Sequence, residues 1–390
     1  MHQLKTYLCL GLCIAACLVL SSGCKTVSQE KSVAIGVNLA LSGTGMSYGE
    51  STERGIELAK DIVNKNGGIL GQPVQVISVD NHGLPDDAQA AVKELSLRHV
   101  AAIIGPNMTA CALAVIPEAE VGKIPVISPA GTHPDITVDG RTREVYRYMF
   151  RATFIDAYQG RAMADYAVRQ LRGRTAAVVY DGTSTYSRGL AEFFRKAFEA
   201  DGGTVPVFLA LDQPDTDLAD IGQVLAASPC DVIYAPFYDD QAAQCIRVIR
   251  GSGMMQPILG PDGWNGQKLA QSVDPVWLSQ LYYTDHYAND VKRKESEAFA
   301  EAYYEKYGLL PDSYAALGYD SFMMAADAIS RSQTGKPKDV AAELAKTVDF
   351  VGVTGSVTLD ANHDAVKDIY IMTFWQGEPA LLEKEPTVSL

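Results

Sequence analysis

Short apolar runs alternate with longer amphipathic segments from Val33 to Trp264, and few folds accommodate such an alternation. The first run, Val33–Leu39, has the apolar character of a strand that is buried on both faces. Strands that alternate with helices form parallel sheets joined by right-handed crossovers. Two sets of these β/α units follow one another without a low-complexity linker. The sequence therefore predicts an α/β fold of two packed lobes.

The same periodicities predict the individual elements. Strands are expected at residues 33–39, 74–80, 101–104, 125–127, 148–151, 175–180, 204–209, 231–236, 257–259, 281–284, 355–359 and 369–375. Helices are expected at residues 48–66, 86–99, 156–171, 187–200, 218–226, 239–250, 291–307, 314–332 and 340–347, and one more is expected to begin at Thr109.

Two neighbouring strand ends carry small hydroxyl residues. The loop after residues 101–104 leads to Thr109 at a helix start, and the loop after residues 125–127 contains Thr132. Ligands of open parallel sheets bind in the crevice outside the carboxyl ends of the strands. A helix N-terminus there directs free N–H groups and a positive dipole end toward the ligand, which predicts a site for a small anion such as a carboxylate. Each threonine also has a purely structural interpretation: Thr109 could be only a helix N-cap, and Thr132 taken alone is better explained as a turn residue.

The N-terminal residues are predicted to be a targeting segment. Residues 8–20 form an apolar run that is too short to span a membrane but suits the core of a signal peptide. Ser21, Ser22 and Gly23 then precede Cys24, which resembles a bacterial lipoprotein signal with Cys24 as the lipidated residue. We expect a signal peptide at 1–24 and a tether at 25–32. Cleavage nearby by an ordinary signal peptidase is the alternative.

Composition and cysteine spacing exclude several classes of function. The chain has 390 residues and a net charge of -14, which argues against a nucleic-acid partner because phosphate binding needs clustered lysine and arginine. No cysteine or histidine has metal-ligand spacing, so neither a metal nor a cofactor is predicted. Cys230 and Cys245 flank one strand-helix unit and could pair, which the sequence leaves open.

Enzyme motifs are weak in this chain. Gly43, Gly45 and Gly49 follow a strand, and Asp80 ends the next strand, which imitates a dinucleotide-binding fingerprint. However, Tyr48 occupies the position of the third glycine. The segment from Gly182 does not complete a GxSxG nucleophile motif, because Tyr186 stands where the second glycine would be. These patterns favour a protein that is not an enzyme.

Eight phrases in order carry a resemblance to a known family. They are LALSGTGMSYGE at 39–50, DIVNKNGGILGQPV at 61–74, AAIIGPNMTACA at 101–112, IPVISPAGTHPDIT at 124–137, STYSRGLAEFF at 184–194, DVIYAPFYDD at 231–240, ILGPDGW at 258–264 and YAALGYDSFMMA at 314–325. The chain resembles the substrate-binding lipoproteins of branched-chain amino-acid ABC transporters, the Leu/Ile/Val type with a type I periplasmic-binding fold.

The resemblance implies two Rossmann-like lobes joined by three crossovers, with lobe 1 at 33–151 plus 285–357 and lobe 2 at 152–284 plus 358–390. It also implies a lipid-anchored protein on the periplasmic or cell-surface face of the bacterial membrane. Such a protein captures an amino acid between its lobes and delivers it to ABC permease subunits. Alternatives are a binder of another small carboxylate or amide, or a ligand-sensing receptor component of the same fold.

The polar ligand contacts implied by the resemblance are four. The hydroxyl and N–H of Thr109 would bind the ligand α-carboxylate, and Thr132 would touch both the carboxylate and the ammonium. The backbone carbonyl of Ala130 would accept from the ammonium. Asp262 would be its countercharge, although an acid between Pro261 and Gly263 is by itself a typical turn residue.

The remaining implied contacts surround the rest of the ligand. Tyr186 and Phe237 would close over it, and Tyr48 would line the first lobe. Asn107 and Met108 would lie where the ligand side chain points. Branched-chain binders tend to be apolar there, so Asn107 favours a ligand with a polar group.

Overall fold

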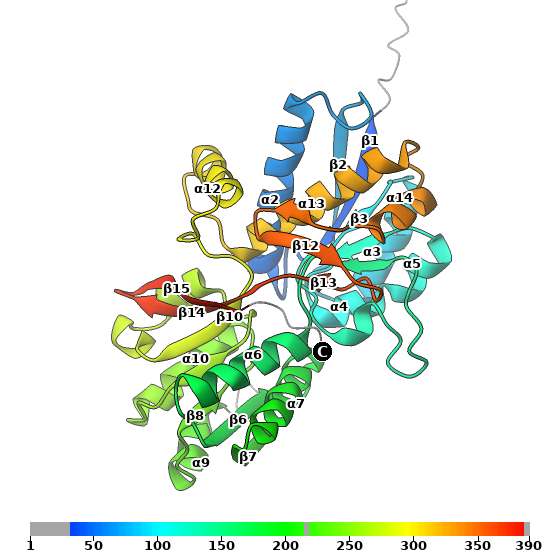
Figure 1. Cartoon of the computed structure of the whole chain (residues 1–390). Coiled ribbons are helices and arrows are strands. Elements are labelled where there is room, and N and C mark those ends of the chain that lie inside the picture. The colour runs from blue at the N-terminus through cyan, green and yellow to red at the C-terminus, as the bar shows by residue number, and fades with distance from the viewer. Residues whose placement is uncertain (1–31, 214–217, 386–390) are drawn as a thin grey trace, which may run out of the picture. The chain divides into compact units, whose positions relative to one another are not determined.

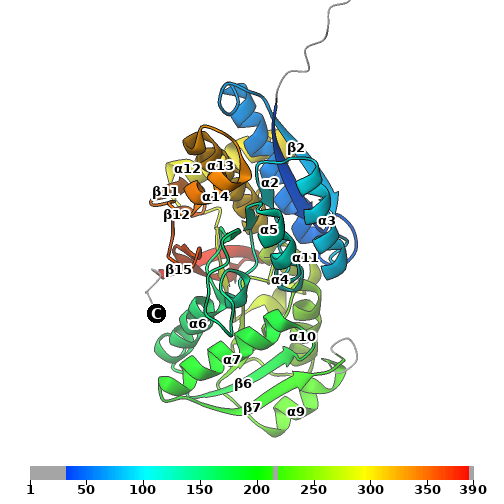
Figure 2. The same ribbon diagram turned by 90° about the vertical axis from the view of Figure 1, so that its right-hand side faces the viewer.

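The computed structural model describes residues 32–213 and 218–385. The predicted signal peptide, Cys24 and nearly all of the predicted tether lie outside the described residues. Two sheets organise the rest of the chain (Figures 1 and 2). We call each sheet, with the helices that pack on it, a lobe.

The first sheet has five strands in the order β2-β1-β3-β4-β5. All its neighbours are parallel. Its strands are β1 (Val33–Leu39), β2 (Val74–Asp80), β3 (Ile103–Ile104), β4 (Val126–Ser128) and β5 (Met149–Arg151). Early helices of the chain are α2 (Met46–Lys65), α3 (Pro85–Leu97), α4 (Thr109–Ala114), α5 (Ile116–Gly122) and the 3-10 turn η2 (Pro134–Ile136). Because the strands are parallel, the loops that follow them lie at one edge of the sheet.

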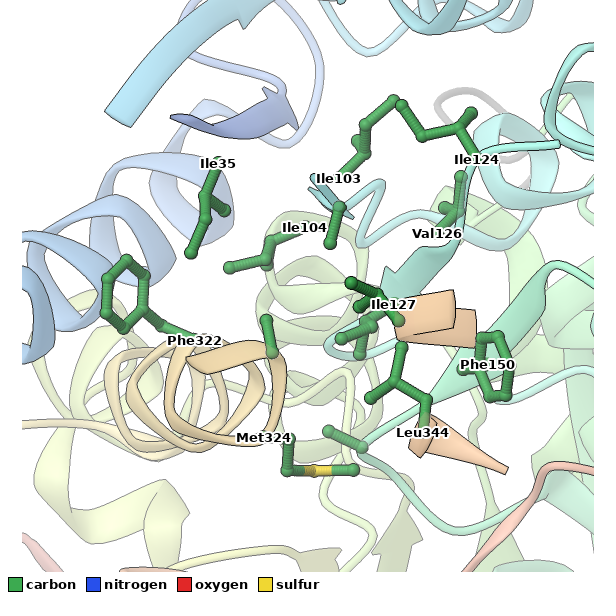
Figure 3. Close-up of a cluster of buried hydrophobic side chains, with 14 of the residues drawn as sticks. Ile35, Ile103, Ile104, Ile124, Val126, Ile127, Phe150, Phe322, Met324 and Leu344 are labelled. Carbon is green, nitrogen blue, oxygen red and sulfur yellow. The ribbon is translucent and has the colours of Figure 1, made fainter. Parts of the chain in front are cut away.

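Helices from far along the chain complete this lobe. They are α12 (Lys294–Tyr307), α13 (Ser313–Ser332) and α14 (Pro337–Leu344). Figures 1 and 2 show α13 beside α2. A Cβ on Gly55 of α2 would lie 1.9 Å from the Ala315 carbonyl oxygen, so the two helices approach closely only because Gly55 has no side chain. Figure 3 shows how Phe322 and Met324 of α13 pack against the isoleucines of β1, β3 and β4 in a fully buried core.

The second sheet has seven strands in the order β15-β14-β10-β9-β8-β6-β7. Strands β6 to β10 pair in parallel, whereas β14 and β15 are antiparallel to their neighbours. The strands are β6 (Thr175–Asp181), β7 (Thr204–Leu211), β8 (Val232–Tyr234), β9 (Ile258–Gly260), β10 (Leu281–Asp285), β14 (Ile369–Trp375) and β15 (Glu378–Glu385). The helical elements are α6 (Asp156–Arg169), α7 (Thr185–Ala200), η3 (Leu218–Asp220), α9 (Ile221–Ala227), α10 (Asp239–Gly251), α11 (Gly266–Ser272) and η4 (Pro275–Leu278).

Side chains of β6 alternate between two apolar layers, as the two-residue period of a strand requires. Ala176 and Val178 pack in the cluster that contains residues of α6 and α7. Ala177 and Val179 pack in the cluster that contains residues of α9 and α10. The second lobe is therefore covered by helices on both faces, which confirms the predicted α/β class with parallel sheets.

A third, small sheet joins β11 (Phe350–Gly352), β12 (Gly355–Leu359) and β13 (Ala365–Val366). Leu359 and Ala365 pack in the core of the first lobe. The expected lobe boundaries remain a prediction, but this packing favours a return to the second lobe after β13 rather than at residue 358. Likewise, Asp285 ends a strand of the second sheet and pairs with Tyr370.

The described residues also bear on the cysteines, on membrane spans and on metal sites. Cys230 and Cys245 are both free thiols, and Cys111 is a buried core residue of α4. Among residues 32–213 and 218–385, there is no helix of sufficient length and apolarity to cross a bilayer. The same residues contain no group of three or more His, Cys, Asp or Glu side chains that could hold a metal ion.

Candidate functional site

A small cavity lies where loops from the carboxyl edges of both large sheets meet. Its lining consists of Tyr48, Asn107, Met108, Ala130, Tyr186, Tyr238, Asp262 and Tyr314. The free volume is about 10 Å³, which is close to the space of one water molecule. Six of the nine ligand residues expected from the sequence are in this lining. The described lining contains one carboxylate and neither lysine nor arginine, so it suits a cationic group better than an anionic one.

Asp262 is the charged group of the cavity and is only 3% exposed. Its Oδ1 accepts hydrogen bonds from the Tyr186 hydroxyl at 2.7 Å and from Gln159 Nε2 at 3.0 Å. Its Oδ2 lies 3.0 Å from His286 Nε2. Within the described part of the chain, His286 is the one basic side chain that forms an ion pair with Asp262.

Gln159, on α6, fixes the Asp262 turn from two sides. Its amide nitrogen donates to Asp262 and also to Asp156 Oδ1 at 3.1 Å. Its carbonyl oxygen accepts from the Asp262 backbone N–H at 3.2 Å and from Thr284 Oγ1 at 2.8 Å. With both ends of the amide engaged, Gln159 holds the acid in one orientation. Sequence reasoning missed Gln159, which lies more than one hundred residues from the acid that it positions.

Asp156 is a second acid behind the cavity. Burial raises its pKa from 3.8 to about 7, and the charge of Asp262 adds to the rise. Hydrogen bonding with Thr132 and Gln159 and the charge of Arg151 oppose this rise. The Thr132 hydroxyl nevertheless has no hydrogen bond of normal geometry, and neither does Asp156 Oδ2. We take the contact between these two groups as a weak one.

Four tyrosines surround the cavity, and two of them, Tyr48 and Tyr314, make hydrogen bonds from the first lobe to the second. The Tyr48 hydroxyl donates to the Gly263 carbonyl and accepts from the Asp239 N–H, both at 2.9 Å. The Tyr314 hydroxyl donates to the Asp262 carbonyl at 3.2 Å. The Tyr186 and Tyr238 rings stack with centroids 4.5 Å apart. These contacts join α2 and α13 of the first lobe to the turn after β9 of the second.

Asn107 presents an unpaired acceptor to the cavity. Its Nδ2 donates to Thr52 Oγ1 at 2.8 Å and to the Tyr48 carbonyl at 3.3 Å. Its Oδ1 has no hydrogen-bond partner, although the residue is only 8% exposed. An unpaired buried acceptor costs about 1–3 kcal/mol, so this atom favours a ligand that supplies a donor.

Two of the predicted carboxylate contacts do not line the cavity. Thr109 begins α4 as expected, but its backbone N–H faces the Tyr238 hydroxyl. Burial raises the pKa of this phenol, and the hydrogen bond with the Thr109 N–H opposes the rise in part. Thr132 is fully buried beside the start of α6, where its carbonyl accepts from the Asp156 N–H at 2.9 Å. Their roles in ligand binding therefore remain predictions.

Phe237 does not line the cavity, and its role in closing over a ligand stays a prediction. It is fully buried in the apolar cluster between the second sheet and α10. Its N–H donates to the Ala235 carbonyl at 2.8 Å, which makes a three-residue turn around Pro236 after β8. This turn directs the next residue, Tyr238, to the cavity instead. The aromatic contact is thus displaced by one residue, and the adjacent tyrosine in the sequence is the signal that could have found it.

Asp80, the acid of the sequence pattern that resembles a dinucleotide-binding fingerprint, has a structural role. The Asp80 carboxylate accepts from the Leu41 N–H at 2.9 Å and from the Ser42 hydroxyl at 2.6 Å. It therefore holds the loop after β1, which accounts for an acid at the end of β2 without a nucleotide. His133 flanks the turn that contains Thr132, and its Nδ1 accepts from the Asp135 N–H at 3.2 Å.

A larger groove of about 750 Å³ lies apart from this cavity. It runs between α11, the end of β10 and the segment before α13, and none of the eight residues that line the cavity lines it. Burial raises the pKa of Asp285, which lines the groove, to about 8. We place the candidate site at the smaller cavity because only there do the carboxyl edges of both sheets meet.

The chain is similar to several known proteins. The chain is 26% identical to the Leu/Ile/Val-binding protein homolog 3 of Brucella melitensis over 59% of this chain and 61% of that protein, so the match spans less than two thirds of the relative. It is 26% identical to an amino acid binding protein of Pseudomonas aeruginosa over 89% of this chain and 91% of the relative.

Among solved structures, the chain is similar to the branched-chain amino acid transporter substrate binding protein LivJ of Streptococcus pneumoniae, solved in complex with isoleucine. The TM-score is 0.84 and the identity 30%, over 91% of this chain and 99% of that one. The family model for periplasmic binding proteins matches residues 32–378. The chain therefore belongs to the periplasmic binding protein family.

Proposed function

We propose that this protein binds an amino acid between its two lobes, with the ligand ammonium at Asp262, and delivers it to an ABC permease. The observation that carries the proposal is the environment of Asp262. This buried carboxylate accepts from two neutral donors, a phenol and an amide, and a buried charge requires a counter-ion. The described lining offers none from lysine or arginine. A ligand ammonium supplies the missing positive charge.

The cavity also bears on the ligand side chain. Asn107 Oδ1 is the unpaired acceptor of the lining. A ligand with a hydroxyl or amide donor satisfies this atom, whereas a purely aliphatic side chain leaves it unpaired. This observation favours a polar amino acid, or a small amide, over leucine, isoleucine and valine. The related proteins named above support the amino-acid class but do not decide the side chain.

Transport and anchoring complete the proposal. The relative with isoleucine bound belongs to a branched-chain amino acid transporter, which supports a permease partner. We place the protein at the extracytoplasmic face of the membrane, held by a lipid on Cys24, and without catalytic activity. A small-residue run before a cysteine and a signal-like apolar core support the anchor.

A thermal-shift screen of the purified mature protein against the twenty amino acids and a set of small carboxylic acids tests the binding function. A ligand at 100 times its Kd stabilises the folded state by about 2.7 kcal/mol. One or more amino acids should raise the melting temperature, and polar ones should raise it most. If only acids without an amine raise it, the alternative of a carboxylate binder replaces this proposal.

The anchor has a separate test. Cys24→Ala should block lipid attachment, so the protein should move from the membrane fraction to the soluble extracytoplasmic fraction. Mass spectrometry of the mature N-terminus of the unsubstituted protein should find an acylated cysteine. A variant that stays in the membrane fraction with the same mature N-terminus would contradict lipidation at this residue.

A further inference from the structure

We infer that His286 is an internal counter-ion of Asp262 that competes, when protonated, with the ammonium of the ligand. This inference rests on the proposed function, because it concerns the same carboxylate. Neutral His286 leaves the charge of Asp262 for the ligand, whereas its imidazolium neutralises that charge. His286 is thus a positioning residue whose protonation state controls affinity.

Most of the hydrogen-bond acceptor positions of Asp262 are already occupied. A carboxylate offers about four lone-pair positions, two on each oxygen. Tyr186 and Gln159 occupy both positions of Oδ1, at 2.7 Å and 3.0 Å. His286 Nε2 occupies one position of Oδ2, at 3.0 Å. A ligand ammonium therefore meets the carboxylate at the same oxygen that His286 contacts.

The protonation state of His286 determines the net charge of its pair with Asp262. Tyr186 and Gln159 are neutral donors, and His286 is the one ion-pair partner of Asp262 in the described ranges. When Nε2–H of a neutral imidazole donates to Oδ2, Asp262 keeps a full negative charge. When the imidazole carries a second proton, the pair is neutral and a ligand ammonium adds an unbalanced charge to a buried site. The two cations are therefore alternatives.

His286 itself is buried and only 2% exposed. The ring stacks on Phe154 with centroids 3.8 Å apart, and Thr153 Oγ1 lies 3.1 Å from Nε2 and 3.4 Å from Nδ1. Both residues lie in the connection from β5 to α6. The neutral tautomer that donates to Asp262 has Nδ1 free to accept from Thr153.

Three titratable groups act on the imidazole or stand next to it. Burial lowers the pKa of His286 below 6.5, the charge of Lys367 lowers it further, and Asp262 raises it. Asp285 Oδ1 accepts from the backbone N–H of His286 at 2.7 Å, and burial raises the pKa of Asp285 to about 8, so this acid is mostly protonated at neutral pH. Burial lowers the pKa of Lys367 itself to about 8. The imidazole is consequently neutral at pH 7.

The consequence for binding follows by linkage. A ligand ammonium beside Asp262 disfavours the imidazolium, so ligand binding lowers the pKa of His286, and acid weakens ligand binding to the same extent. For one coupled proton, affinity falls by at most about tenfold per pH unit, within the interval between the pKa values of the free and bound forms. A carboxylic acid that lacks the amine shows no such loss through His286.

Histidine NMR titration tests the pair without any ligand. The protein labelled in its histidine rings is titrated from pH 8 to 5, and the His286 signal is assigned by its loss in His286→Gln. We expect a pKa below 6.5 in the unsubstituted protein and a lower one in Asp262→Asn, because the anion that favours the imidazolium is gone. An unchanged or higher pKa in Asp262→Asn overturns the inference.

Calorimetry tests the coupling to the ligand. The affinity of L-glutamine or L-leucine, whichever raises the melting temperature more, is measured at pH 7.5, 6.5 and 5.5. We expect the loss of affinity toward pH 5.5 to be smaller in His286→Gln than in the unsubstituted protein. Asp156 also gains a proton over this range, so Asp156→Asn is the matched control and should keep the part of the loss that is due to His286.

The two proposals fail in different ways. Equal pH dependence in His286→Gln and the unsubstituted protein overturns the role of His286 while amino-acid binding stands. If neither amino acid binds at pH 7.5, the proposed function loses its support, and the ligand-free titration still decides whether the pair exists.

Discussion

Removing the Asp364 carboxylate should destabilise the fold more than any exposed charge change, because it leaves Arg151 buried without its ion-pair partner. Arg151 ends β5 and is fully buried. Its Nε lies 2.7 Å from Asp364 Oδ1, although the N–H bond does not point at that oxygen, so the contact is an ion pair rather than a hydrogen bond. Its other nitrogens donate to the Gly131 and His133 carbonyls at 3.0 and 2.9 Å and to Thr137 Oγ1 at 3.0 Å.

The magnitude follows from this environment. Breaking a buried ion pair by removing one partner costs about 3–5 kcal/mol. Burial lowers the pKa of Arg151, and Asp364 is the largest of the charges that oppose this, followed by Asp156 and Asp360. Because those two acids remain in Asp364→Ala, we expect a loss near the lower limit, about 3 kcal/mol. Urea denaturation followed by circular dichroism measures it as a fall in the midpoint at unchanged slope.

Two further variants make this test decisive. Asp364→Asn keeps an acceptor for Thr137 and should lose less than the alanine variant. The double variant Arg151→Met with Asp364→Leu removes both charges and should recover part of the loss, as replaced buried pairs often do. A loss below about 1 kcal/mol in Asp364→Ala, the size expected of an exposed pair, would refute the reasoning.

Three other predictions follow from close contacts and burial. A Cβ on Gly49 would lie 1.8 Å from the Ala40 carbonyl oxygen, so Gly49→Ala should lower the free energy of unfolding, measured by urea denaturation, by about 1–3 kcal/mol. In the control Gly251→Ala the new Cβ has no atom within 4 Å, so this change should be neutral or stabilising. Equal losses of stability in the two variants would contradict the packing argument. Burial raises the pKa of Asp285 from 3.8 to about 8, so the folded protein retains a proton that the unfolded chain releases, and stability is lost as pH rises from 4 to 8. The melting temperature of Asp285→Asn should exceed that of the unsubstituted protein by a margin that grows from pH 5 to pH 8. A margin that is constant with pH would count against this prediction. Tyr186→Phe removes the hydroxyl that accepts from the Gly263 N–H and donates to Asp262, so calorimetry should find roughly tenfold weaker amino-acid binding. Unchanged affinity would show that the hydroxyl has no role.

Much of the fold was predictable because burial on both faces gives a strand a strong pattern. The bounds of β1, β2, β12 and β14 agree with those expected. The prediction of one helix from Thr109 missed the break at Val115, where Pro117 opens the separate helix α5. β15 was missed as well. Its residues are mostly half-exposed or exposed, and it is held by pairing with β14, which the sequence of a single segment does not reveal.

The candidate site was predictable where a residue type and a strand end coincide. Asp262 lies in the loop after β9, Tyr186 lies in the first turn of α7 just beyond β6, and both line the cavity. Residues that act on these side chains from elsewhere were not predictable. Gln159 and His286 contact Asp262 from α6 and from the connection after β10, and each is an ordinary polar residue in its own segment. Their position depends on how the two sheets converge, which local patterns do not record.

The central claim is that Asp262 binds the ammonium of an amino acid, and the most direct test is a comparison of two ligands on two proteins. Calorimetry gives the affinity of the best amino acid from the screen and of its deaminated analogue, for the unsubstituted protein and for Asp262→Asn. Loss of a buried charge partner costs about 3–5 kcal/mol, and each 1.4 kcal/mol is about tenfold. We predict that Asp262→Asn weakens the amino acid at least about a hundredfold and changes the deaminated analogue by less than about tenfold, in either direction. An amino acid that binds the variant as tightly as the unsubstituted protein, or equal losses for both ligands, would contradict the claim.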